Sequence, residues 1–149
     1  MLKRTHLAIG FAAALYFLPH MKNKAIFLSV VILATLLPDI DSGFSTLGKN
    51  KIFRPLQMLV HHRGVIHSYT VCIPLTILLS FYYPILAFPF FLGYSFHLFA
   101  DSFTNQGIRP LWPLKFSSSG KIVTGGRIES AVFFTLLIVD AALLVKLFI

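Results

Sequence analysis

The chain has 149 residues, of which 56% are hydrophobic and sixteen are Phe, and its mean hydropathy is +0.80. A soluble domain of this length could not bury so much apolar surface, so the composition predicts that lipid covers much of it. The net charge of +8 would suggest nucleic acid in a soluble protein. Here Lys and Arg occupy short polar segments between apolar runs, as membrane topology requires, and no nucleic-acid partner is expected. One Cys excludes an intrachain disulfide.

Five apolar runs follow one another along the chain, at residues 7–18, 25–37, 65–83, 84–103 and 128–149. They predict a single all-α domain over residues 1–149, a polytopic membrane bundle of four to five transmembrane helices. The last three runs are near the roughly 20 residues that a bilayer crossing needs. The first two are shorter, and we expect them to form a helical hairpin that turns at residues 19–24.

The cations are divided unequally between the two polar sides that five crossings would create. The side with the N-terminus carries most of them: Lys3, Arg4, Lys49, Lys51, Arg54, Arg63, Arg109, Lys115, Lys121 and Arg127. The other side carries only Lys22, Lys24 and Lys146. Because cytoplasmic loops are enriched in Lys and Arg, the N-terminus is predicted to face the cytoplasm, in a multi-pass protein of the inner (plasma) membrane.

Nine ionisable residues within or beside the apolar runs fall on this cytoplasmic side. They are His6, Asp39, Asp41, His61, His62, His67, His97, Asp101 and Glu129. Ionisable groups at membrane depth cost several kcal/mol unless they are paired or bound, so they mark functional sites. His and carboxylate side chains are the usual protein ligands of zinc and related ions. The sequence therefore predicts a metal site at one membrane face.

Local spacing supports this prediction. His97 and Asp101 are four residues apart, which places them on one face of a helix. His62 and His67 can meet only if the chain bends at Gly64, and Pro38 ends the second run ahead of Asp39.

Several of these polar residues also have a simpler explanation. Asp39 and Asp41 alone are explained equally well as a helix cap. His20, on the other side, is expected to be an interfacial anchor, and Asp140 lies off the site face.

Gly10, Ala13 and Ala14 would let the first helix approach its neighbours closely. The first two runs are shorter than the hydrocarbon core, about 30 Å thick, which predicts ligands several Å below the near headgroups.

Three sequence motifs carry a resemblance to a known family. They are Leu-Pro-Asp-Ile-Asp at 37–41, His-Arg-Gly-Val-Ile-His-Ser at 62–68 and Gly-Tyr-Ser-Phe-His-Leu-Phe-Ala-Asp-Ser-Phe-Thr at 93–104, the last continued by Gly-Ile-Arg-Pro-Leu-Trp-Pro at 107–113. Together they resemble the YdjM family of inner-membrane proteins, described as membrane-bound metal-dependent hydrolases. The chain departs from the family pattern at Ile66, where Thr is more usual, and His61 is an extra residue.

The resemblance implies a ligand set and a chemistry. The family is thought to be remotely similar to zinc-dependent phospholipase C and P1-type nucleases, which use His-x-x-x-Asp ligands. The implied ligands are His6, Asp39, Asp41, His62, His67, His97 and Asp101. They suggest one to three divalent ions, most simply zinc, because seven ligands exceed one tetrahedral ion.

The expected reaction is hydrolysis of a phosphoester in a membrane lipid. Asp39 or Asp41 would act as general base, and Arg63 and Arg109 would hold phosphate, although both Arg are explained equally well as cytoplasmic-side charge. Two alternatives remain open: cleavage of a lipid acyl or amide bond at the same site, and metal binding without catalysis.

Overall fold

The computed structural model describes residues 1–41 and 65–149, apart from the side chains of residues 40 and 41. These residues form five α-helices and two short 3-10 helices: α1 (Lys3–Phe17), η1 (Leu18–His20), α2 (Lys24–Leu36), η2 (Pro38–Asp41), α4 (Tyr69–Tyr82), α5 (Pro84–Ser102) and α6 (Arg127–Phe148). Within them no β-strand forms, and only two isolated bridges pair residues 104–108 with residues 118–122. The predicted all-α class is confirmed.

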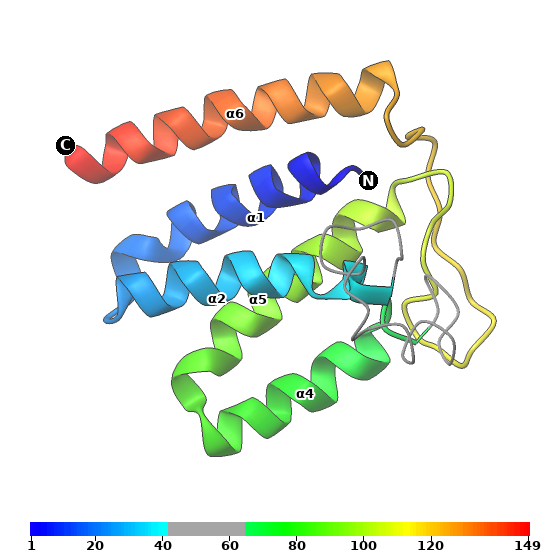
Figure 1. Cartoon of the computed structure of the whole chain (residues 1–149), viewed down its shortest axis with the longest axis horizontal. Helices are drawn as coiled ribbons and strands as arrows, with labels where there is room; N and C mark the ends of the chain where they lie inside the picture. The colour runs from blue at the N-terminus through cyan, green and yellow to red at the C-terminus, as the bar shows by residue number, and fades with distance from the viewer. Residues whose placement is uncertain (42–64) are drawn as a thin grey trace.

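Helices α1, α2 and α5 make the centre of the bundle, with α4 packed on α5 and α6 chiefly on α1 (Figure 1). Pro19, in the first turn of η1, starts the reversal between α1 and α2, and the predicted hairpin of the first two runs is present. Its core is made by Ala13, Ala14, Phe27, Val31 and Leu92. The small residues of α1 therefore lie at a helix interface, as expected.

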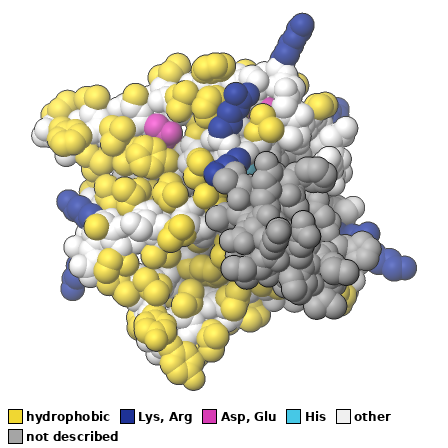
Figure 2. Space-filling view, viewed as in Figure 1, with side chains coloured by type: hydrophobic (Ala, Val, Ile, Leu, Met, Phe, Trp, Pro, Cys, Tyr) yellow, Lys and Arg dark blue, Asp and Glu magenta, His cyan; other side chains and the backbone are white. Residues whose placement is uncertain are grey.

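Two helices, α5 and α6, are long and apolar enough to cross a membrane. With 22 residues, α6 is about 33 Å long, yet only 6% of its most apolar stretch is buried. Figure 2 shows hydrophobic side chains over much of the described surface. An apolar helix exposed to this degree needs lipid or another apolar surface to cover it.

The third predicted run is shorter as a helix than the sequence suggests. α4 begins only at Tyr69 and has 14 residues, about 21 Å, because the backbone at Ser68 is extended (φ −139°). The Ser68 hydroxyl donates to the Val65 carbonyl at 2.5 Å and stabilises a turn ahead of the helix. Helices α1, α2 and α4 are each shorter than a full crossing, so the number of four to five spans stays a prediction.

Two glycines set the spacing of the central helices. A Cβ added at Gly93 of α5 would lie 2.3 Å from the Val31 carbonyl of α2. A Cβ added at Gly10 of α1 would lie 2.4 Å from the Thr35 hydroxyl of α2. Because glycine has no side chain, α5 can pack directly against the α2 backbone at Gly93, and α1 can pack against the Thr35 side chain of α2 at Gly10.

We expect Gly93→Val to lower the stability of the protein by about 1–3 kcal/mol, since the added side chain would overlap backbone rather than a movable side chain. Thermal unfolding in detergent measures the change. Ala141→Val places the same side chain at an exposed position of α6 and is the matched control. Equal melting temperatures for the two variants would contradict the close approach of α2 and α5.

Candidate metal centre

The polar side chains predicted for one membrane face meet at one end of the bundle. This end holds the beginnings of α1 and α6, the end of α5, and η2 (Figure 1). The residues that converge are His6, Asp39, His67, His97 and Asp101, referred to below as the metal cluster. They come from four separate segments of the chain, and the structure brings them within a few Å of one another.

His97 and Asp101 form the α5 part of the cluster. Their side chains lie on the same face of the helix, with His97 Nε2 3.8 Å from Asp101 Oδ2. His97 is completely buried and Asp101 is 1% exposed. A carboxylate and an imidazole at this depth require compensation of their polarity, which the other cluster residues supply.

His6 approaches from α1. Its ring stacks on that of His97, with centroids 3.8 Å apart and planes 9° from parallel. Its Nε2 lies 3.2 Å from Asp101 Oδ1, although the angle is not that of a hydrogen bond. Both ring nitrogens of His6 are buried with no hydrogen-bond partner among the residues described. Such orphaned nitrogens are costly without a further partner.

His67 and Asp39 complete the cluster from the turn before α4 and from η2. His67 Nε2 lies 3.3 Å from His97 Nε2 and 3.8 Å from Asp101 Oδ2. Asp39 Oδ1 lies 3.9 Å from His67 Nε2 and 3.8 Å from His97 Nε2. The Asp39 side chain is 21% exposed and is the most accessible part of the cluster.

The donor atoms fit a divalent ion. They divide into two groups that share His97: His6, His97 and Asp101 in one, and Asp39, His67 and His97 in the other. With bonds of about 2.1 Å, tetrahedral ligand atoms lie roughly 3.4 Å apart, and the separations of 3.2–3.9 Å here are close to that value. The unpartnered nitrogens of His6 provide a second reason, since a metal would use one of them.

A backbone carbonyl orients His97. The His97 Nδ1 lies 2.7 Å from the Thr35 carbonyl oxygen, which can only accept, so Nδ1 carries the proton. When the imidazole is neutral, its Nε2 lone pair therefore faces the cluster. This is the usual arrangement of a metal-binding His, whose other nitrogen is held by a carbonyl or carboxylate.

Tyr94 holds the turn that carries His67. Its hydroxyl donates to the Ile66 carbonyl, one residue before His67, and its side chain is fully buried. The Tyr69 backbone N–H donates to the Pro110 carbonyl at 2.8 Å, so the 104–127 connection is attached to the same turn. The orientation of His67 thus depends on two contacts that the motifs do not identify.

The segment after α5 keeps Asp101 in place. The Thr104 hydroxyl donates to the Asp101 carbonyl at 2.7 Å, and the Gly120 N–H donates to the Thr104 carbonyl at 2.9 Å. A Cβ at Gly120 would lie 2.2 Å from the Phe103 carbonyl, so only glycine permits this contact. Residues 118–122 thus run against the end of α5 and the segment that follows it.

Glu129 and Asp140 have other surroundings. The Glu129 carboxylate accepts hydrogen bonds from the Leu2 N–H at 2.5 Å and the Gly125 N–H at 2.6 Å, and so joins the beginnings of α1 and α6. α1 has no capping side chain of its own, and Glu129 supplies one from another helix. Asp140 lies in a groove between α1 and α6 with Arg4 and Phe133, away from the metal cluster.

Some predicted site residues are not placed by the structure. His61, His62 and Arg63 lie outside the described residues, and for Asp41 only the backbone is described, in η2 next to Asp39. Arg109 is exposed in the connection after α5, beside Pro110. Their predicted roles as ligands or phosphate contacts remain predictions.

Comparison with known proteins agrees with the motifs. The sequence profile described as "YdjM inner membrane protein" matches residues 1–148. The chain belongs to the YdjM family. It is similar to "Inner membrane protein YdjM" of Escherichia coli (strain K12), with 35% identity over 96 residues that cover 57% of this chain and 48% of that protein. The protein of the same name from Shigella flexneri matches equally well.

This YdjM-family member therefore spans about half the length of the relatives it matches. No solved structure matches the chain. The family name places it in the inner membrane, as the apolar composition and the long exposed α6 indicate. The expected resemblance to this family is confirmed, whereas the remoter similarity to phospholipase C and P1 nuclease stays a prediction.

Metal binding by the purified protein tests the cluster. We expect His6→Gln and His97→Gln each to weaken binding of Zn²⁺ at least about tenfold, because each removes a donor nitrogen. Titration against a competing chromophoric chelator, with elemental analysis, gives the affinity and the stoichiometry.

His20→Gln is the matched control, since His20 is exposed at the opposite end of α1. Less than about half an equivalent of metal in the wild-type protein would contradict a metal centre that contributes to folding. Equal affinities in the His20 and His97 variants would contradict the ligand assignment.

Proposed function

We propose that this YdjM-family protein is a metal-dependent hydrolase that cleaves a phosphoester bond of a membrane lipid. The observation that carries the proposal is the metal cluster, in which three His and two Asp side chains from four segments converge at one end of an apolar bundle. Burial of these groups costs stability, so the cluster is better explained by bound metal and chemistry than by packing.

The arrangement of Asp101 favours two ions. Its Oδ1 pairs with the N-terminal ammonium group and lies 3.2 Å from His6 Nε2, whereas its Oδ2 lies 3.8 Å from the Nε2 atoms of His67 and His97. We infer that His6 and Asp101 would hold one ion and that His67, His97 and Asp39 would hold a second, with Asp101 close to both groups of donors. Zinc suits this mixture of nitrogen and oxygen donors.

A pair of bound divalent ions supplies two effects, a lower pKa for a coordinated water and compensation of charge that develops on phosphate oxygens. Side chains of the protein would supply the proton acceptor and the contacts to phosphate. Asp39 is the cluster carboxylate with most solvent access, which suits a group that accepts a proton from the attacking water. Arg109 and Arg63 are proposed to hold phosphate oxygens, since guanidinium matches them bidentately.

The setting of the cluster supports the proposal of a lipid substrate. It lies at the end of an apolar bundle whose α6 surface needs a lipid-like environment. A centre sunk slightly below one headgroup layer would meet the phosphoester of a phospholipid. Hydrolysis of an acyl or amide bond would use the same water, and metal binding alone would need no substrate. The reaction products therefore distinguish phosphoester hydrolysis, acyl or amide hydrolysis and metal binding without catalysis.

The wild-type protein, loaded with zinc in mixed micelles, is expected to release phosphate or a phosphorylated headgroup from at least one phospholipid of an inner-membrane panel. Asp101→Asn should reduce the rate by at least about a hundredfold, because it removes a charge that both ions use. Ser102→Ala changes a half-buried neighbour on α5 and should leave the rate unchanged. Fatty acid as the only product would favour acyl hydrolysis, and tight metal binding without any product would favour the non-enzymatic role.

The metal cluster is proposed to face the cytoplasm. Ten of the thirteen Lys and Arg lie on the side of the bundle that holds it, if the five apolar runs all cross.

A reporter that is active only in the cytoplasm, inserted after Lys115 in the 104–127 connection, should therefore be active. A second reporter fused after Asn23, between α1 and α2, is the control and should be inactive. Activity of the second reporter alone would reverse the orientation, and activity of both would contradict the crossing of the first two helices.

A further inference from the structure

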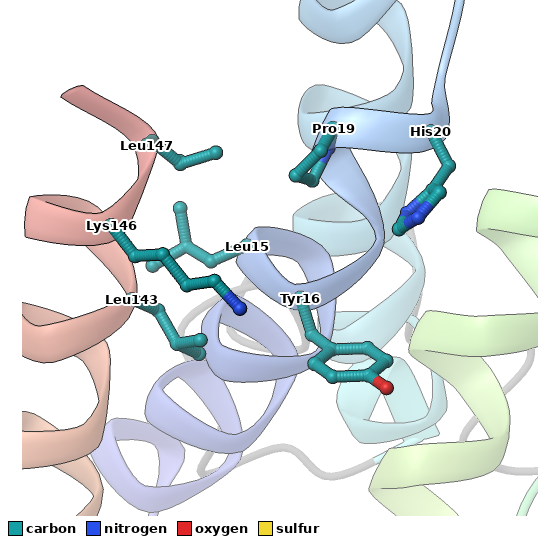
Figure 3. A pocket seen from close by; sticks show the side chains of 7 residues that line it. All are labelled: Leu15, Tyr16, Pro19, His20, Leu143, Lys146 and Leu147. Carbon is teal, nitrogen blue, oxygen red and sulfur yellow. The ribbon is translucent and has the colours of Figure 1, made fainter. Parts of the chain in front are cut away.

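A pocket of about 390 Å³ lies at the opposite end of the bundle from the metal cluster, between α1 with η1 and the last turns of α6 (Figure 3). Its polar lining is the Lys146 ammonium group, the His20 imidazole and Tyr16. Leu15, Leu143 and Leu147 provide apolar walls. The pocket is therefore cationic at one part and apolar at another.

Helical spacing explains why these residues meet. Leu143, Lys146 and Leu147 are three and four residues apart and share one face of α6. Tyr16 lies near the end of α1, and the 3-10 turn η1 brings His20 back beside it. Figure 3 shows the Lys146 side chain extending from α6 across the pocket toward α1.

The chain has no acidic side chain at this end to balance these donors. Of its five acidic residues, Asp39, Asp41, Asp101 and Glu129 belong to segments at the metal end. Asp140 lies six residues before Lys146, about 9 Å along the helix axis, in the separate groove with Arg4. No ion pair with Lys146 occurs within residues 1–41 and 65–149. Lys22 and Lys24 add further positive charge to the connection between α1 and α2.

The position of the pocket along α6 matches the opposite membrane interface. From Arg127 to Lys146 the helix rises about 29 Å, close to the roughly 30 Å thickness of a hydrocarbon core. If Arg127 lies at one headgroup layer, Lys146 lies at the other. A ligand at this depth is reached from the bilayer more directly than from solvent.

We propose that this pocket binds the phosphate of an anionic phospholipid, in the leaflet opposite the metal cluster. Lys146 contacts the phosphate as a point charge, and the His20 ring donates a hydrogen bond to one of its oxygens. The three Leu side chains contact the glycerol and the upper acyl chains. Because α6 packs chiefly on α1, a lipid seated between the two would stabilise the attachment of α6. This site is independent of the proposed hydrolase activity.

Native mass spectrometry of the full chain, after delipidation and titration with phosphatidylglycerol or phosphatidylcholine, tests the proposal. The wild-type protein should retain phosphatidylglycerol preferentially, and Lys146→Gln should bind it about fivefold more weakly, which is the loss expected for one cation near a lipid surface. His20→Gln should also weaken binding. Lys121→Gln, in the 104–127 connection, is the matched control and should bind as the wild type does.

The outcomes separate the possible explanations. Equal binding of the two lipids by the wild-type protein, or no loss in Lys146→Gln, would overturn the site. An equal loss in Lys121→Gln would show general attraction to basic charge and would also overturn it. Displacement of the lipid by excess inorganic phosphate would identify a site for free phosphate instead. Zinc content measured on the same samples should be identical, so failure here leaves the metal centre unaffected.

Discussion

The contact on which the structure depends is the burial of His97 against the Thr35 carbonyl, at the centre of the polar end of the bundle. His97 lies between His6 and His67, within 4 Å of Asp39 and Asp101, and none of its ring is exposed. Polar groups in an apolar bundle are stable only if each has a partner. The carbonyl satisfies one nitrogen of His97 and leaves the other for the cluster.

The close packing of α1, α2 and α5 follows from this constraint. Thr35 must approach α5 for its carbonyl to reach His97, and Gly93 on α5 allows that approach at Val31. Gly10 on α1 accommodates the Thr35 side chain in turn, which brings His6 into contact with His97. The small residues are thus part of how the cluster is assembled. Glu129 then holds the start of α1 from α6, so all these helices contribute to one centre.

The two ends of the bundle differ in charge and in chemistry. One end combines carboxylates with His and offers ligands to a cation. The other end has a pocket with Lys146 and His20 but no acidic side chain in its lining, and it suits an anion. The same helices, α1 and α6, contribute to both ends. A protein with a metal centre at one interface and a lipid contact at the other would be held at a defined depth in the membrane.

The sequence alone predicted the all-α class, the family and the hairpin of the first two helices. Its predicted ligands include all five cluster residues, together with Asp41 and His62, whose side chains lie outside the described part of the structure. Apolar periodicity and the rarity of ionisable groups within apolar runs carry that information. The start of α4 at Tyr69 was not predicted, because hydropathy alone begins the run at Val65. Ser68, a residue type that favours helix N-caps, marks the start instead. Only the tertiary structure showed that the Thr35 carbonyl orients His97 and that the Tyr94 hydroxyl holds the turn that carries His67. A backbone carbonyl has no residue-type signal, and contacts between helices far apart in sequence are decided by packing.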